Sequence, residues 1–353
     1  MNLVTVELRR LRWRRITKGV AAAFIAFLAI LTVGTFMDSQ PPTAQEQQQA
    51  QQWYDQAKRD WDANAAQQIA QCTQSQAETR AGGDTNADFH CDSMKAPEYS
   101  DFGRPLPTLE RLVQTSLAGA APVLMFLALI VGASFIGAEF TSGSIATFLT
   151  FEPRRVRVGT AKLVAVALWV LVAAIAGTAL VWSITWGVGQ LHAVPRATLA
   201  AAESGLARSS AGVTGDPFTV EDSSFAGSLW VSARTVLLSA LAGVAGSALG
   251  LLLRNTTATL AVVIGYLVVG EGILGNLFGR RLQPWLVQGN VRAVQIGGAD
   301  YSTDVCTSMP QGGQSCESIN HHLSMAHGGI YLAVCATTLI ALALWSFRRR
   351  DLS

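Results

Sequence analysis

Long apolar stretches alternate with polar segments along the chain, and they set its architecture. The apolar stretches cover residues 19–37, 117–138, 161–191, 228–253, 256–278 and 328–347. A helix needs roughly 20 predominantly apolar residues to cross the hydrocarbon core of a bilayer, so each stretch predicts one transmembrane helix. The first is longer than the h-region of about 7 to 15 residues in a signal peptide, and no small-x-small cleavage site follows it. The pattern predicts an all-α polytopic membrane protein with six transmembrane helices.

The segment before the first span predicts a helix that lies on the membrane surface. Residues 1–18 place apolar side chains amid arginines, namely Leu3, Val6, Leu8, Leu11 and Trp13. A basic amphipathic helix of this kind lies in the headgroup layer, with its arginines on anionic lipid. A plain basic flank of the first span is the alternative, but the periodic Leu and Trp favour the interfacial helix.

The segment 38–116 is the longest polar stretch between two spans. Within it, residues 45–71 are rich in Gln and Ala and space Trp53, Tyr54 and Trp61 as on a helix, so we expect a helix there. The segment is too small to bury a large core, which makes a covalent link useful. The remaining outside segments are a loop over 192–227 and a re-entrant segment and loop over 279–327, and a short tail follows over 348–353.

Composition agrees with a membrane protein, and the basic residues orient it. The 353 residues are 50% hydrophobic and 14% charged, whereas soluble domains carry about 25% charged residues. Lys and Arg are in excess beside the cytoplasmic ends of spans. Placing both termini inside puts Arg9, Arg10, Arg12, Arg14, Arg15, Lys18, Arg154, Arg155, Arg157, Lys162, Arg254 and Arg348–Arg350 in the cytoplasm, against Glu7, Glu139, Glu152 and Asp351. We therefore expect both termini in the cytoplasm.

The cysteines support this orientation. Cys72 and Cys91 share one predicted outside segment, Cys306 and Cys316 share another, and Cys335 is alone in the last span. Local pairs on one face are typical of an oxidising compartment. Neither pair has the C-x-x-C spacing of a zinc site, so disulfides Cys72–Cys91 and Cys306–Cys316 are favoured over a metal site.

Two ionisable residues fall inside predicted spans, Arg234 in the fourth and Glu271 in the fifth. At about 1.5 Å per residue they lie at similar depths, about 8 and 10 Å from the outer ends of their spans. An unpaired charge in hydrocarbon is costly, so we predict an Arg234–Glu271 ion pair. Its role is structural, unless Glu271 lines a polar cavity.

The fourth span also has a face of small residues, made by Ala242, Gly243, Gly246, Ser247 and Gly250. Small side chains let another helix approach closely. We therefore expect this face to pack on protein rather than on lipid.

The sequence lacks several catalytic signatures. It has no G-x-x-x-x-G-K-[ST] phosphate loop, which excludes ATP hydrolysis by that route. It also has no H-E-x-x-H and no G-x-S-x-G motif. His90, His321, His322 and His327 would serve an outer-face enzyme only beside a carboxylate, and a metal site is less favoured for them. A protein with six spans and no motor of its own suggests a separate motor as partner.

The cytoplasmic loop over 139–160 has the most distinctive pattern in the chain. Helical spacing places Phe140, Gly143, Ser144, Phe148 and Phe151 on one side of a short helix. Pro153 then breaks the helix. The basic cluster of Arg154, Arg155, Arg157 and Lys162 follows, and it cannot enter the bilayer. A short helix held against the membrane suits docking to a cytoplasmic partner, and an ordinary charged loop is the alternative.

The stretch GAEFTSGSIATFLTFEPRRVRVGTAK resembles a motif in the membrane subunits of ABC-2 type exporters, where it forms the coupling helix seated on the ATPase. The matching positions are Glu139, Phe140, Gly143, Ser144, Ile145, Phe148, Leu149, Pro153, Arg155 and Lys162. VELRRLRWRR resembles the connecting helix of that family, and LQPWLVQGNVRAV resembles its outer re-entrant segment. The resemblance does not extend to residues 38–116, an enlarged first outside segment.

This resemblance implies the permease subunit of an ATP-binding-cassette exporter in the bacterial plasma membrane. Such a subunit is not an enzyme and holds no cofactor, because ATP and Mg are bound by a separate ATPase subunit. A second permease chain completes the transporter, with a homodimer favoured over a heterodimer, and substrate would contact spans one, two and five. Lipid is the other partner, and nucleic acid is not expected. The alternatives are a membrane sensor or assembly scaffold that binds a partner through residues 38–116, or, less favoured, an outer-face membrane enzyme.

Overall fold

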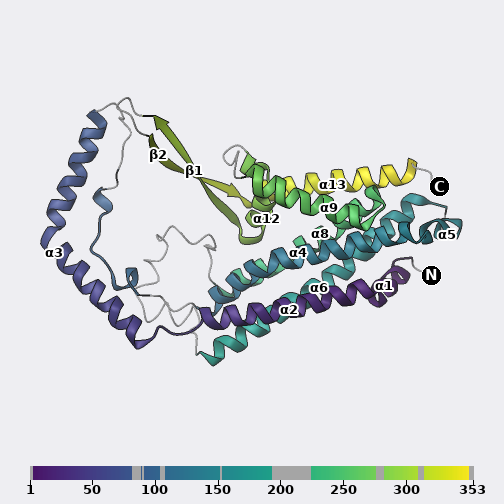
Figure 1. The fold of residues 1–353 in the computed structure, drawn as a ribbon, viewed down its shortest axis with the longest axis horizontal. Helices are drawn as coiled ribbons and strands as arrows, with labels where there is room; N and C mark the ends of the chain where they lie inside the picture. Colours follow the sequence, from purple (N-terminus) through teal and green to yellow (C-terminus); the bar gives the residue numbers. More distant parts are fainter. Residues whose placement is uncertain are drawn as a thin grey trace.

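The computed structural model is a helical bundle with a long helix and a β-hairpin projecting from one end (Figure 1). It describes residues 3–81, 89, 91–103, 108–151, 153–192, 224–275, 282–308 and 314–349. Within these residues, six helical stretches are long and apolar enough to cross a membrane. They are α2 (Arg15–Asp38), α4 (Leu109–Thr141), α6 (Arg155–Leu191), α8 (Phe225–Leu253), α9 (Thr256–Gly265) with its continuation η5 (Tyr266–Leu274), and α13 (Met325–Arg349). The predicted all-α membrane architecture with six spans is confirmed.

Helix α4 is the centre of the bundle. Thr108 caps its start, where the side-chain oxygen accepts a hydrogen bond from the backbone N–H of Arg111. It packs most closely on α8, and glycines permit the approach. A Cβ built on Gly132 of α4 would overlap the carbonyl oxygen of Gly243, and one on Gly246 of α8 would overlap that of Leu129. The predicted small-residue face of the fourth span therefore packs on protein, within the same chain.

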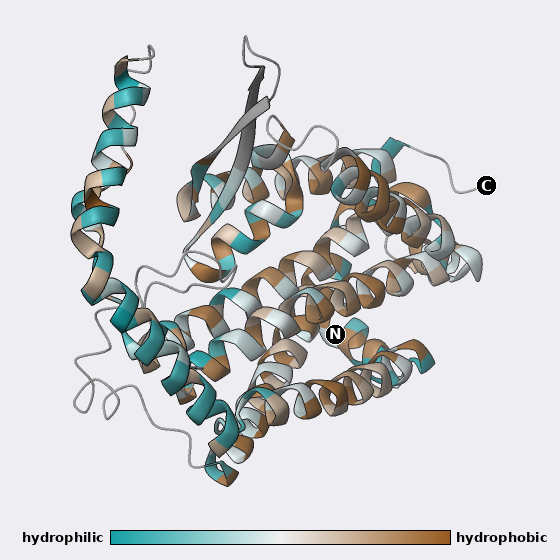
Figure 2. Cartoon of the chain, turned by 60° about the vertical axis from the view of Figure 1, so that its left-hand side comes forward, coloured by the Kyte–Doolittle hydropathy of each residue, from teal (hydrophilic) through white to brown (hydrophobic). Residues whose placement is uncertain are grey.

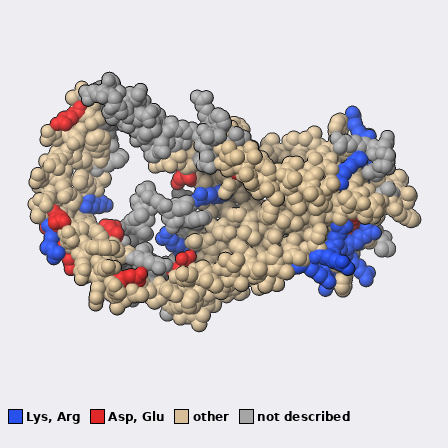
Figure 3. All heavy atoms as spheres, viewed as in Figure 1, with Lys and Arg blue, Asp and Glu red and all other residues tan. Residues whose placement is uncertain are grey.

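Both termini and the short helix α5 (Ser144–Phe151) lie at one end of the bundle, which we call the terminal end (Figure 1). Most of the Lys and Arg visible in Figure 3 gather there, whereas acidic side chains are more frequent toward α3 (Ala44–Ala81). The largest buried apolar cluster lies toward the terminal end, with Phe135 of α4, Leu163 of α6, Leu251 of α8 and Phe347 of α13 among its members. Helix α1 (Leu3–Trp13) packs on α6 beside this cluster.

Helix α3 lies outside the bundle and is mostly hydrophilic (Figure 2). It begins in a capping box, since the Thr43 backbone N–H donates to the Glu46 carboxylate and the Glu46 N–H donates to the Thr43 hydroxyl. The returning chain, with the 3-10 turns η1 (Cys91–Ser93) and η2 (Tyr99–Asp101), is held to α3 by the disulfide Cys72–Cys91. The predicted helix and its disulfide are both present.

The segment between the fifth and sixth spans is more ordered than expected. It contains η6 (Gln283–Trp285), α12 (Val287–Ile296) and a two-stranded antiparallel hairpin of β1 (Gly298–Ser308) and β2 (Gln314–Ser324). The hairpin was not predicted. Its register pairs Cys306 with Cys316. The side chains of these two cysteines lie outside the described residues, so their disulfide stays a prediction.

Candidate functional site

Helix α5 is joined to α4 by one sharp turn at the terminal end. Gly143 there has φ +70°, a left-handed conformation that glycine adopts without steric cost. The Ser142 hydroxyl donates to the Ser144 hydroxyl, with 3.1 Å between the oxygens, and so supports the turn. Glu139 and Phe140 therefore belong to the last turn of α4 and not to the short helix, which corrects the sequence-based assignment.

The side chains of α5 divide between the protein and the surface. Ile145 is buried against the core, and Phe148 and Leu149 are half-buried. Phe151 points away from the chain and is 85% exposed. Phe148 and Phe151 thus differ in burial although they are three residues apart on the helix, because Phe151 is its last residue.

Beneath α5, a buried network of charges joins helices that are distant in sequence. Lys162 of α6 places Nζ 2.8 Å from Oε1 of Glu7 on α1 and 2.6 Å from Oε2 of Glu139 on α4. Arg14, between α1 and α2, lies 3.5 Å from the other oxygen of Glu139. The side chains of Lys162 and Glu7 are each 1% exposed and that of Glu139 is 5% exposed. We call these residues, Glu7, Arg14, Glu139 and Lys162, the ion network.

Aromatic rings enclose the two cations of the network. The ring of Phe135 lies 5.3 Å from Lys162 Nζ and 4.8 Å from the Arg14 guanidinium carbon, and the ring of Phe148 lies 5.3 Å from Lys162 Nζ. These are cation–π distances, at which ring faces attract a cation. Phe148 therefore fastens α5 directly to the ion network.

The network is balanced in charge. Two carboxylates and two cations carry opposite and equal formal charge, which limits the cost of taking them out of water. Burial lowers the pKa of the Arg14 guanidinium from its ordinary value, while the carboxylates of Glu139 and Glu7 act in the opposite direction. Arg14 also donates to the backbone oxygen of Ser134 at 3.1 Å, which fixes the α1–α2 junction on α4.

The structure corrects one expectation at this site and shows which residues of α1 contact the protein. Lys162 does not belong to a solvated basic cluster with Arg154 and Arg157, because it is buried in the ion network while those arginines are exposed. Helix α1 turns Glu7 and Leu11 to the protein, and Trp13 is 69% exposed. The spacing of Glu7 and Arg10, at i and i+3, places both on one face of α1, where they form an ion pair, and is a local signal that Glu7 lies among cations.

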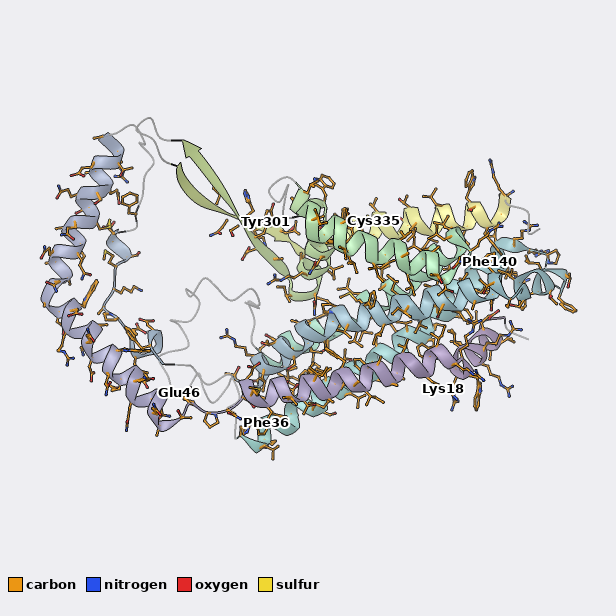
Figure 4. The ribbon with its side chains drawn as sticks, in the orientation of Figure 1. Lys18, Phe36, Glu46, Phe140, Tyr301 and Cys335 are labelled. Carbon is orange, nitrogen blue, oxygen red and sulfur yellow. A yellow bond between two sulfur atoms is a disulfide. The ribbon has the colours of Figure 1, made fainter. Side chains whose placement is uncertain are left out.

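The remaining motif residues lie around the same end. Phe140, labelled in Figure 4, packs edge-on against Phe347 of α13 with 6.2 Å between ring centroids, and Arg254 lies over its other side at 5.6 Å. Pro153 is exposed in the link to α6, and Arg155 is half-buried at the first turn of that helix. The motif therefore reaches α13 as well as α4, α5 and α6.

The described residues do not form the predicted Arg234–Glu271 ion pair. Glu271 accepts a hydrogen bond from the backbone N–H of Gln288, at the start of α12, with 2.9 Å between the atoms. Arg234 lies beside Gly297, at the other end of α12. The rise between these two ends is about 13 Å at 1.5 Å per residue, so α12 keeps the two charges apart.

The histidines do not gather into one site in the described part of the chain. His322 donates through Nδ1 to the Asp300 carboxylate at 2.7 Å, but both side chains are largely exposed. His321 stacks on Tyr301, and His327 lies beside Trp285. His90 lies outside the described residues. No group of three potential metal ligands is found among the described residues.

Comparisons with known proteins identify a family. The model of the family described as ABC-2 family transporter protein matches residues 1–352, which is nearly the whole chain. No curated protein and no solved structure matches the chain.

Proposed function

Because the chain belongs to the ABC-2 family of transporter proteins, we propose that it is the permease subunit of an ATP-driven exporter. The subunit forms the route through the membrane, and a separate nucleotide-binding subunit binds ATP and Mg and hydrolyses ATP. The observation that carries this proposal is α5, which presents an exposed Phe151 outward and is fastened inward to the ion network.

The terminal end faces the cytoplasm in this proposal. Exposed basic residues on α1 and in the α5–α6 link flank the spans closely there, and the side with more Lys and Arg is the cytoplasmic one. The disulfide of the α3 segment lies at the other end and suits an oxidising outer face. The plasma membrane of a bacterium combines these two conditions with an ATP supply.

Coupling proceeds through rigid elements rather than through chemistry in this chain. The ATPase contacts Phe151 and the exposed face of α5. A push on α5 passes to the ion network through Phe148, and from there to α1, α4 and α6, since Glu7, Glu139 and Lys162 are joined directly. Long helices carry the displacement across the membrane, where a change between two packed states opens the route outward.

A second copy of the chain completes the transporter. The first and fifth spans bury the smallest share of their residues within the chain, 11% each, whereas the second span buries 56%. Their exposed apolar faces are therefore free for lipid or for another subunit. We propose a homodimer in which these two spans face the partner chain and substrate passes between the halves.

The test is copurification of the chain with the candidate ATPase, followed by ATP turnover of the complex in lipid. Phe151→Ala should reduce the amount of ATPase retained at least tenfold without changing the yield of the permease, because this side chain makes little contact with its own chain. Trp345→Ala is the matched control, as Trp345 is a 55% exposed aromatic on α13 near the same end. Equal retention of the ATPase by Phe151→Ala and wild type would remove α5 as the docking element.

A further inference from the structure

The residues Trp285 to Gln288 fasten the fifth and sixth spans to each other at the end of the bundle opposite the termini. The carbonyl oxygen of Trp285 accepts a hydrogen bond from the Tyr331 hydroxyl of α13 at 2.6 Å. The backbone N–H of Val287 donates to the Tyr266 hydroxyl at 3.2 Å. The N–H of Gln288 donates to Glu271, also in the fifth span. These contacts bring a carboxylate and three aromatic side chains together.

One oxygen of the Glu271 carboxylate accepts two hydrogen bonds, and the other accepts none from the described residues. Its Oε1 accepts from the Tyr266 hydroxyl at 2.8 Å and from the Gln288 N–H at 2.9 Å. Within the described part of the chain, Oε2 receives no hydrogen bond and no Lys, Arg or His forms an ion pair with this carboxylate. The Glu271 side chain is only partly buried. A negative charge near the end of a span, without a cation among the described residues, leaves room for an external cation.

Three aromatic residues belong to the same cluster of contacts as Glu271. Trp285 is 62% exposed and Tyr266 is 40% exposed, and the rings of Trp285 and Tyr331 lie 6.4 Å apart. One helical turn beyond Tyr331 on α13 lies Cys335, which is labelled in Figure 4. Carboxylates with Trp and Tyr faces recognise alkylated ammonium groups, through charge and cation–π attraction together.

The helix that carries Glu271 is also unusual. Residues Tyr266–Leu274 form a π-helix within the fifth span. Such stretches are rare and are frequent at functional sites. The i, i+5 geometry brings Tyr266 and Glu271 onto the same side, where their side chains bond to each other. The local winding therefore builds the site, and a regular α-helix would separate these two residues.

We infer that Glu271, Tyr266, Trp285 and Tyr331 form a binding site for the ammonium group of an amphiphilic organic cation. The site lies at the end of the fifth span, where a bound molecule can keep its apolar part in the bilayer. A transported cationic amphiphile and the choline headgroup of a lipid share this chemistry. That the occupant is a transport substrate rests on the proposed export function, whereas binding itself does not.

The test measures equilibrium binding of radiolabelled dodecyltrimethylammonium to the full chain in lipid nanodiscs, without ATPase. Glu271→Gln is the informative variant, because glutamine keeps an acceptor for Tyr266 and Gln288 and removes only the charge. Arg234→Gln is the control for the ion pair that the sequence predicts. We expect saturable binding by wild type, at least tenfold weaker binding by Glu271→Gln, and unchanged binding by Arg234→Gln.

Two results would overturn the inference. One is binding by Glu271→Gln as tight as that of wild type, with both proteins folded by size-exclusion chromatography. The other is markedly tighter binding by Arg234→Gln than by wild type, which would show that Arg234 competes with the ligand for Glu271. Repeating the measurement in discs with and without phosphatidylcholine separates the sources, since weaker binding beside phosphatidylcholine identifies the lipid headgroup as a competitor for the site. Loss of binding with intact ATPase docking would leave the proposed function standing.

Discussion

Lys162 Nζ of α6 lies 2.6 Å from Glu139 Oε2 of α4, and both side chains are buried. The two residues stand at the two ends of the segment that carries α5, so their contact closes this segment into a loop. A force applied to α5 therefore reaches α4 and α6 together. The third member, Glu7, adds α1 to the same unit.

Removing the central cation should destabilise the chain strongly. Lys162→Met leaves the carboxylates of Glu7 and Glu139 buried, with Arg10 and Arg14 as their remaining cations among the described residues. Breaking a buried ion pair by removing one partner costs about 3–5 kcal/mol, and we expect a loss of about 3 kcal/mol because the arginines remain. Thermal unfolding in detergent, followed by fluorescence, measures the change.

A second substitution should recover much of that loss. Lys162→Met combined with Glu7→Leu leaves one buried pair, Glu139 with Arg14, and balances the charge again. Lys18→Met is the control, since Lys18 (labelled in Figure 4) is exposed at the same end. A Lys162→Met protein as stable as the Lys18→Met protein would contradict the described network.

The close packing of α4 on α8 makes a second prediction, for two glycines of the same helix. Gly132→Val should abolish folding or greatly reduce yield, because a side chain there overlaps the backbone of Gly243. Gly119→Val should be tolerated, because nothing lies within 4 Å of a Cβ at that position. The measurement compares the expression yield and the monodispersity of the two variants. Equal yields would count against the contact between α4 and α8.

Much of this fold follows from the sequence, because the bilayer imposes a length and a polarity on each span. The six apolar stretches and the α3 helix have strong local signals, and so does the helix break at Pro153, whereas Gly143 was assigned to the short helix and lies in a turn. The small residues of the fourth span indicated close packing but not its partner, since pattern alone does not say which helix faces Gly246.

The sequence pattern did not predict the ion network or the β-hairpin, and the causes differ. Glu7 was read as one acidic residue in a basic flank, because its partners Lys162 and Glu139 are distant in sequence and only the packing of α1 on α6 brings them together. Equal depth suggested that Arg234 pairs with Glu271, but depth does not specify which helix lies between two spans. The hairpin had a local signal in the Pro310-Gln311-Gly312-Gly313 sequence between two β-prone runs.

The redox state of the cysteines gives a third prediction. Cys72 and Cys91 are bonded, the strand register sets Cys306 opposite Cys316, and Cys335 is free and exposed. Under denaturing, non-reducing conditions we expect one reactive thiol per chain, and all five after reduction. Three reactive thiols before reduction would show that the hairpin cysteines are not linked.

Orientation gives a fourth prediction, which a membrane-impermeant maleimide can check in a Cys335→Ser background. Trp53→Cys, at a 57% exposed position of α3, should react in intact cells. Phe151→Cys should react only after the membrane is opened, because α5 faces the cytoplasm in the proposal. Reaction of Phe151→Cys in intact cells, with Trp53→Cys reacting only after the membrane is opened, would show the opposite orientation.

The most direct test of α5 as the docking helix is site-specific photocrosslinking in cells that contain the candidate ATPase. A photoreactive phenylalanine analogue is placed at position 151, and separately at positions 345 and 53. The account predicts a crosslink to the ATPase from position 151, and none from position 53 on the opposite side of the membrane. A crosslink from position 53 or 345 with none from 151 would contradict the central claim that the ATPase is seated on α5.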